Sequence, residues 1–161
     1  MDSRLKRNLI QFVKFCVVGG SGVVVNLLVF TAVLLVWASA TGHIHSAADF
    51  AASVRGFVVR KDTEGVPTAA VYVANAAGFV VSVLTNYYLN RRWTFRSSAA
   101  VGAELTRFFV VSVAAYLANL AVFSVLHSAV HVAPIPSQVI AIACVMPINF
   151  VFNKLWSFRT A

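Results

Sequence analysis

Charged side chains are scarce in this sequence. Only 11% of its 161 residues are charged, and 5 acidic residues stand against 13 basic ones. An average soluble domain carries about 25% charged residues. Because 60% of the residues are also hydrophobic, the composition excludes an ordinary soluble domain and predicts a membrane protein.

Cysteine is equally rare, and the two cysteines lack the spacing of a ligand set. Cys16 and Cys144 lie inside apolar runs, without a CxxC pair. Such cysteines are typically small core residues, so we expect neither a disulfide framework nor a zinc site. His127 and His131 are four residues apart but have no third ligand beside them, and we expect no metal there.

Residues for catalysis or for ion coupling are also missing. No Asp, Glu, Lys or Arg lies deep in an apolar run, whereas proton- or sodium-coupled transporters usually need an intramembrane carboxylate. This argues against a small multidrug exporter. A buried Ser/His/Asp set and a Gly-rich phosphate loop are absent as well, so we expect neither enzymatic activity nor a cofactor.

Four long uncharged runs are present. A helix needs about 20 residues to cross a bilayer core of about 30 Å, and runs 15–40, 69–90, 108–132 and 135–153 are each about that long or longer. They lack the alternation of strands, and the first is too long for the h-region of a signal peptide. The expected fold is therefore an all-α polytopic membrane protein with four transmembrane helices.

The chain contains an internal repeat. Residues 86–96 (NYYLNRRWTFR) return at 149–159 as NFVFNKLWSFR, an offset of 63. At an offset of 93, Lys14, Phe15, Asn26 and Phe30 match Arg107, Phe108, Asn119 and Phe123. We therefore predict a single membrane domain over 1–161, built from two helical hairpins at about 12–96 and 105–159, with an insertion at about 39–68 in the first.

The distribution of basic residues predicts the topology. With four spans, both termini and the middle loop lie on one side of the membrane. That side carries Arg4, Lys6, Arg7, Lys14, Arg91, Arg92, Arg96, Arg107, Lys154 and Arg159, whereas the other carries Arg55, Arg60 and Lys61. The excess places both termini in the cytoplasm, so the two hairpins enter the membrane in the same direction.

The insertion has the signature of a short helix. Ser46 and Asp49 resemble a capping box, and apolar residues follow at helical spacing. We expect an amphipathic helix lying on the extracytoplasmic membrane surface. It serves either as a solvated structural loop or as a lid over a substrate.

Amides and cations recur in the two copies. The matched amides are Asn26, Asn86, Asn119 and Asn149, with Asn90 and Asn153 one turn nearer the cytoplasm, and the cations at that surface are Lys14, Arg91, Arg107 and Lys154. Cations bind phosphate and amides exchange hydrogen bonds with sugar hydroxyls, so a lipid phosphate bearing a polyol suits the pattern. Alternatively, the amides only hold helices together inside an interfacial belt with Trp93 and Trp156 as anchors.

These residues resemble a known family. The Lys14-Phe15 entry to a Gly-rich span and the paired endings with Asn90 and Trp93, then Asn153 and Trp156, are similar to those of the GtrA-like family of small four-span bacterial membrane proteins. The resemblance implies a role in cell-surface polysaccharide or glycolipid synthesis in the bacterial cytoplasmic membrane. The chain departs from a symmetric pattern at Leu155, which stands where the first copy has Arg92, and in the long insertion.

The resemblance leaves two hypotheses. The chain either flips a polyprenyl-phosphate-linked sugar, with the cations binding the phosphate and the amides the headgroup, or it anchors a membrane glycosyltransferase without transport. A second copy of the chain is a further candidate partner because small-residue stripes bring helices together. No nucleic-acid partner is expected, and the sequence does not specify the sugar or the prenyl length.

Overall fold

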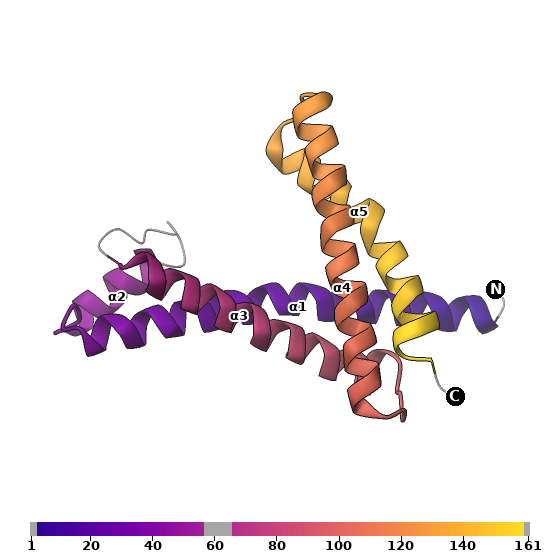
Figure 1. The fold of residues 1–161 in the computed structure, drawn as a ribbon, viewed down its shortest axis with the longest axis horizontal. Helices are drawn as coiled ribbons and strands as arrows, with labels where there is room; N and C mark the ends of the chain where they lie inside the picture. Colours follow the sequence, from indigo (N-terminus) through magenta and orange to yellow (C-terminus); the bar gives the residue numbers. More distant parts are fainter. Residues whose placement is uncertain (1–2, 57–65, 160–161) are drawn as a thin grey trace. The chain divides into compact units, whose positions relative to one another are not determined.

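The structure, a computed structural model, describes residues 3–56 and 66–159 (Figure 1). The elements are α1 (Ser3–Ala40), α2 (Ala47–Arg55), α3 (Thr68–Leu89), η2 (Asn90–Thr94), α4 (Val101–Ser124), η3 (Val125–Ala129), α5 (Pro134–Phe152) and η4 (Asn153–Ser157). Each η element is a five-residue π-helical turn that continues the α-helix before it. The described residues contain no strand.

Four helices are long and apolar enough to cross a membrane. They cover Ser3–Ala40, Thr68–Thr94, Val101–Ala129 and Pro134–Ser157, which confirms the predicted all-α fold with four spanning segments. Two of them begin earlier than the apolar runs, because the basic residues before Phe15 and the polar residues before Phe108 also adopt helical conformation. Which side of the membrane holds the termini remains a prediction from the charges.

The chain forms two compact units. One contains residues 1–18 and 87–161, and the other contains residues 19–86. These units do not coincide with the two sequence repeats, because the first turns of α1 belong with the second hairpin. Each unit is described by itself below.

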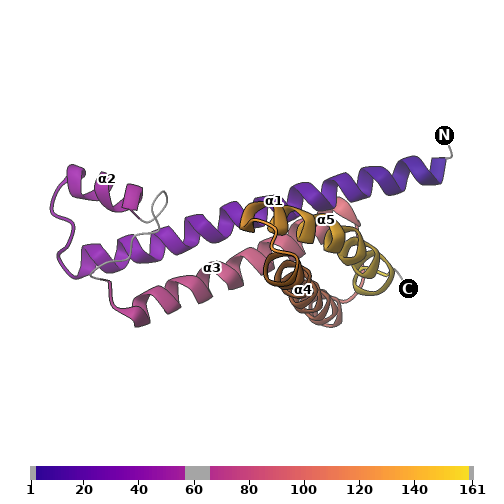
Figure 2. The ribbon, with the colours of Figure 1, turned by 90° about the horizontal axis from the view of Figure 1, so that it is seen from above.

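In the unit of residues 19–86, α1 and α3 run antiparallel and side by side (Figures 1 and 2). Leu34 and Ala74 are fully buried at its centre, and Phe30, Val33, Leu35 and Val66 pack around them. Nearer the other end of the pair, a Cβ on Gly22 would meet the Asn86 side chain at 2.3 Å, and one on Gly78 would meet the Asn26 carbonyl oxygen at 2.8 Å. The Ser82 hydroxyl donates to the Gly22 carbonyl oxygen at 2.7 Å, so small residues bring the backbones together as helix pairs in membranes require.

A single added methyl group should therefore distinguish two glycines. We expect Gly78→Ala to destabilise the protein by about 1–3 kcal/mol, because its Cβ would overlap backbone on α1. Gly20→Ala is the matched control, since nothing lies within 4 Å of that position and alanine favours helix by about 1 kcal/mol. Thermal unfolding of the purified proteins measures both. If Gly78→Ala and Gly20→Ala have equal melting temperatures, the close packing at Gly78 is contradicted.

Helix α2 confirms the predicted capping box. The Ser46 hydroxyl accepts the Asp49 amide at 3.1 Å, and Asp49 Oδ2 accepts the His45 amide at 3.1 Å. Hydrogen bonding to the Asp49 carboxyl by the Ser46 side chain, and then by the His45 amide, lowers the pKa of that carboxyl. The rest of the predicted insertion at 57–65, with Arg60 and Lys61, lies outside the described residues.

In the other unit, α4 and α5 form an antiparallel hairpin (Figures 1 and 2). The Ser137 hydroxyl donates to the carbonyl oxygens of Val132 and Ala133 at the start of α5, where Pro134 suits the first turn because its missing amide hydrogen is not needed there. His131 between the helices has a φ of 58°. At the opposite end of the hairpin, the chain of 1–18 joins η2 and η4 to build the candidate site.

Candidate functional site

A cluster of six aromatic rings organises the basic end of the unit of residues 1–18 and 87–161. Its members are Phe15, Tyr87, Phe95, Phe108, Phe150 and Phe158. Phe95 and Phe158, which match in the sequence repeat, stack with centroids 4.6 Å apart and an interplanar angle of 16°. Aromatic pairs contribute about 0.5–1.5 kcal/mol beyond the area that they bury, so the cluster stabilises this end.

The contacts within the aromatic cluster repeat as the sequence does. The ring centroids of Phe95 and Phe150 are 5.9 Å apart. Those of Phe158 and Tyr87, the residue matched to Phe150, are 6.0 Å apart. Similarly, Phe15 contacts Phe95 and Phe150 as its counterpart Phe108 contacts Phe158 and Tyr87. The sequence repeat is thus a repeat of tertiary contacts.

Arg91 in η2 is held by an ion pair. Its Nη1 donates to Glu104 Oε1 at 2.7 Å, and its Nη2 donates to the Ala99 carbonyl oxygen at 2.7 Å. The Glu104 side chain is 1% exposed and that of Arg91 is 16% exposed. Ser97 donates its hydroxyl to the other carboxylate oxygen, so the positive charge of Arg91 is neutralised.

Lys154 in η4 occupies the matched position but has uncharged partners. Its Nζ donates to Gln11 Oε1 at 2.6 Å and to Asn8 Oδ1 at 2.7 Å. Gln11 matches Glu104 at the offset of 93, so an amide replaces the carboxylate. Among the described residues, the charge of Lys154 is therefore held by two uncharged amides and by no carboxylate.

Two adjoining recesses open at this basic end and share Gln11 and Phe95. The first has a volume of about 470 Å³, and its other lining residues are Lys154, Leu155, Phe158 and Arg159. The second, of about 340 Å³, is also lined by Ser3, Lys6, Arg7, Ile10, Lys14, Thr94 and Arg96. Among the residues that the structure describes, no acidic side chain lines either recess, so both are suited to an anion.

The four predicted phosphate ligands therefore differ in their surroundings. Lys14 and Lys154 line the adjoining recesses. Lys14 also lies 5.1 Å above the Trp93 ring and donates to the Trp93 carbonyl oxygen at 3.5 Å. Arg91 is paired with Glu104, and Arg107 is exposed on α4 outside both recesses.

Buried polar groups line the inner side of both π-helical turns. Asn90 and Thr94 in η2 match Asn153 and Ser157 in η4, and all four are at most 3% exposed. Among the described residues, no partner exists for the Oδ1 atoms of the two asparagines or for the two hydroxyl groups. Asn153 Nδ2 donates to Asn149 Oδ1 at 2.8 Å and to its carbonyl oxygen at 3.0 Å. The two turns thus carry matched, unused hydrogen-bonding capacity.

The other predicted headgroup amides lie in three settings. Asn26 and Asn86 face glycines in the unit of residues 19–86, and Asn86 Oδ1 is buried without a partner in the described structure. Asn119 accepts Gln138 Nε2 at 3.3 Å, linking α4 to α5. Asn149 lies between α4 and α5.

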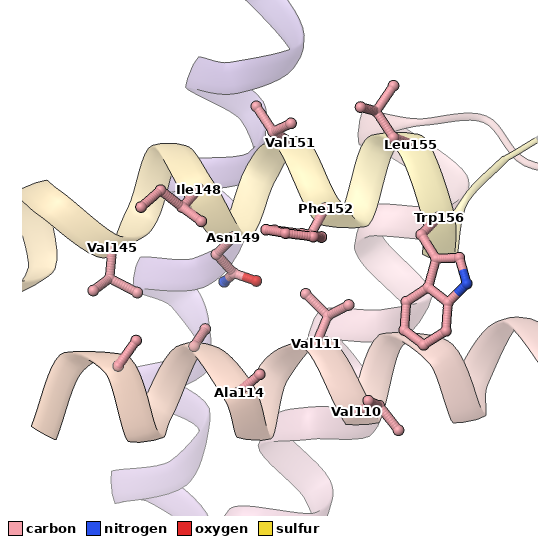
Figure 3. Close-up of a pocket in the computed structure, with 12 residues that line it drawn as sticks. Val110, Val111, Ala114, Val145, Ile148, Asn149, Val151, Phe152, Leu155 and Trp156 are labelled. Carbon is pink, nitrogen blue, oxygen red and sulfur yellow. The ribbon is translucent and has the colours of Figure 1, made fainter. Parts of the chain in front are cut away.

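A groove of about 830 Å³ runs between α4 and α5 beside Asn149 (Figure 3). Asn149 projects from α5 toward α4, where Val111 and Ala114 face it. Apart from Asn149 and the indole of Trp156, the lining side chains are purely hydrocarbon. Trp156, in η4, lines one end of the groove, and both it and Trp93 are 44% exposed, as suits interfacial side chains.

Several residues of the site were not predicted from the sequence. The ion pair of Glu104, the amides Asn8 and Gln11, and the aromatic cluster emerge only from the structure. The offset of 93 contained a signal, because extending it three residues toward the N-terminus aligns Gln11 with Glu104. No group of three or more metal-ligating side chains occurs in the described ranges 3–56 and 66–159.

Comparison with known proteins gives one match. The family model described as GtrA/DPMS, transmembrane domain, matches residues 14–158. This range includes both hairpins, both π-helical endings and the insertion, and the match confirms the family expected from the paired Asn/Trp motifs. No curated protein and no solved structure matches the chain significantly.

Proposed function

The chain belongs to the GtrA/DPMS transmembrane-domain family, and from this premise we propose that it flips a polyprenyl-phosphate-linked sugar across the bacterial cytoplasmic membrane. The family match and the four spanning helices indicate a multi-pass membrane protein that handles sugars linked to a carrier lipid. The proposed transport supplies cell-surface polysaccharide or glycolipid synthesis.

The contrast between Arg91 and Lys154 carries this proposal. The cation of the first copy, Arg91, is neutralised by the buried carboxylate of Glu104. Two amides instead leave the charge of Lys154, its match in the second copy, available beside a recess of about 470 Å³. Arg159 lines the same recess, and Lys14 lines the adjoining one. A phosphate with one sugar suits such a site, because charge-assisted hydrogen bonds to phosphate are strong.

The amides provide the contacts for the sugar in this proposal. Hydroxyl groups are good donors to amide oxygens, and in the part of the chain that the structure describes the Oδ1 atoms of Asn86, Asn90 and Asn153 have no partner. Glu104 is paired with Arg91 rather than available for proton exchange. We therefore propose downhill movement without ion coupling and without a chemical step.

Flipping by purified protein in liposomes tests this function. Wild-type protein should move a polyprenyl-phosphate sugar to the opposite leaflet, as measured by its accessibility to a membrane-impermeant reagent. Replacing Asn86 and Asn149 by leucine should slow this movement about tenfold or more, because two hydrogen bonds of about 1 kcal/mol each are lost.

The same preparation separates the alternatives. Monodisperse elution and an unchanged melting temperature of the double variant would show that it is folded. Undiminished flipping by that folded variant would contradict the assignment of the amides. The alternative function is a membrane anchor without transport. It would be supported if the wild-type protein moves no lipid but retains a glycosyltransferase through the exposed Arg92 and Arg96.

A further inference from the structure

The residues that line the groove between α4 and α5 are less polar than the matched residues of the first hairpin. At four lining positions the second copy has Ala114, Val145, Ile148 and Leu155, where the first has Ser21, Ser82, Thr85 and Arg92. No lining position changes from apolar to polar between the copies. The second hairpin thus presents hydrocarbon where the first presents hydroxyl and guanidinium groups.

Helix packing explains why the second hairpin has room for a groove. In the first hairpin, Gly22 and Gly78 allow Asn86 and Asn26 to fill the space between the helices. The matched positions in the second hairpin are Ala115 and Ala141. Their methyl groups oppose the close backbone approach that glycine permits, and Asn149 consequently lies in a groove of about 830 Å³ (Figure 3).

The groove and a basic recess meet at one residue. Leu155 lines both the groove and the recess that contains Lys154 and Arg159. An anionic group in that recess would therefore lie next to the mouth of a hydrocarbon groove. A ligand with one phosphate at the end of a long hydrocarbon chain complements both surfaces, because each of its parts meets a surface of matching chemistry.

We propose that the groove between α4 and α5 binds the isoprene units nearest the phosphate of the polyprenyl lipid, while the phosphate is held at Lys154. This inference rests on the proposed function and deepens it by assigning the hydrocarbon chain of the lipid to the groove of the second hairpin. Leu155 separates the two parts of the site, so the departure from Arg92 in the repeat is a specialisation for a hydrocarbon chain.

Binding of two probes to the full chain in nanodiscs tests this assignment. The probes are a long-chain polyprenyl phosphate and dimethylallyl phosphate, which carries its phosphate on a single isoprene unit. Ala114→Phe should fill the groove (Figure 3) and weaken binding of the long-chain probe about tenfold, as expected for about two methylene groups left unburied. Dimethylallyl phosphate should bind this variant with unchanged affinity.

Two controls make the outcomes distinct. Ala143→Phe adds the same ring on an exposed face of α5 outside the groove and should bind both probes as the wild type does. Lys154→Gln should bind both probes more weakly than the wild type does. Val145→Ser combined with Ile148→Thr restores the smaller, hydroxyl-bearing residues of the first copy, and it should weaken binding of the long-chain probe alone.

Several results would overturn the inference. If Ala114→Phe binds the long-chain probe as tightly as the wild type while Lys154→Gln binds it more weakly, the groove is not the binding site of the hydrocarbon chain. The proposed function would still stand. If the wild type binds neither probe, both the groove assignment and the proposed function are contradicted. Conversion of a dimer to a monomer by Ala114→Phe with unchanged lipid affinity would show that a second copy occupies the groove instead.

Discussion

Replacing Glu104 by glutamine is expected to lower the melting temperature of the protein by several degrees, because it breaks the ion pair between this buried carboxylate and Arg91. The substitution keeps the shape of the side chain but removes the negative charge beside Arg91. The Arg91 side chain, which is 16% exposed, would remain there without its counter-ion. An uncompensated buried charge is costly because the protein interior solvates it poorly.

Thermal unfolding in detergent and protease resistance of the folded protein measure this effect. Glu104→Gln combined with Arg91→Met is the informative control, because removing both charges should recover most of the loss. Gln11→Met provides a comparison at the matched position in the first copy, where no carboxylate is lost. A Glu104→Gln protein with wild-type stability would show that the ion pair is dispensable.

The opposite change at the matched position should weaken phosphate binding strongly while leaving the fold intact. Gln11→Glu places a carboxylate where the amide oxygen now lies 2.6 Å from Lys154 Nζ. The resulting pair would reproduce that of Arg91 and Glu104. Because a charge-assisted hydrogen bond contributes about 1.5–3 kcal/mol, we expect polyprenyl phosphate to bind about 10–100-fold more weakly.

Native mass spectrometry of gently extracted protein measures the loss through the amount of retained lipid, and a titration in nanodiscs gives the affinity. Gln11→Met is again the matched control, because it removes the amide oxygen without adding a negative charge near the site. It should retain far more lipid than Gln11→Glu. Equal affinity of Gln11→Glu and the wild type would contradict phosphate binding at Lys154.

The sequence was sufficient to predict those features that depend on local pattern. Long uncharged runs identify spanning helices because the bilayer fixes their length, and the structure has four such segments. The Ser46 and Asp49 pattern predicts a helix start because it satisfies backbone amides within one turn. The paired Asn/Trp endings identified the family that the comparison confirmed.

Features that depend on contacts between distant segments were not predictable in the same way. The π-helical turns at Asn90 and Asn153 have no composition that separates them from an α-helical end. Arg91 and Lys154 look equivalent in the repeat, and only their partners from other helices, Glu104 and Gln11, distinguish them. The division into units was also unexpected, because it depends on how the first turns of α1 pack.

The aromatic cluster has a consequence for the order in which the protein can assemble during synthesis. Phe15 leaves the ribosome early, yet its ring contacts Phe95 and Phe150. The innermost stack requires Phe158, the last of the six rings to be translated. The beginning of the first helix can therefore complete its ring contacts only when nearly the whole chain has been inserted. Truncation before Phe150 would leave four rings without the partners that close the bundle.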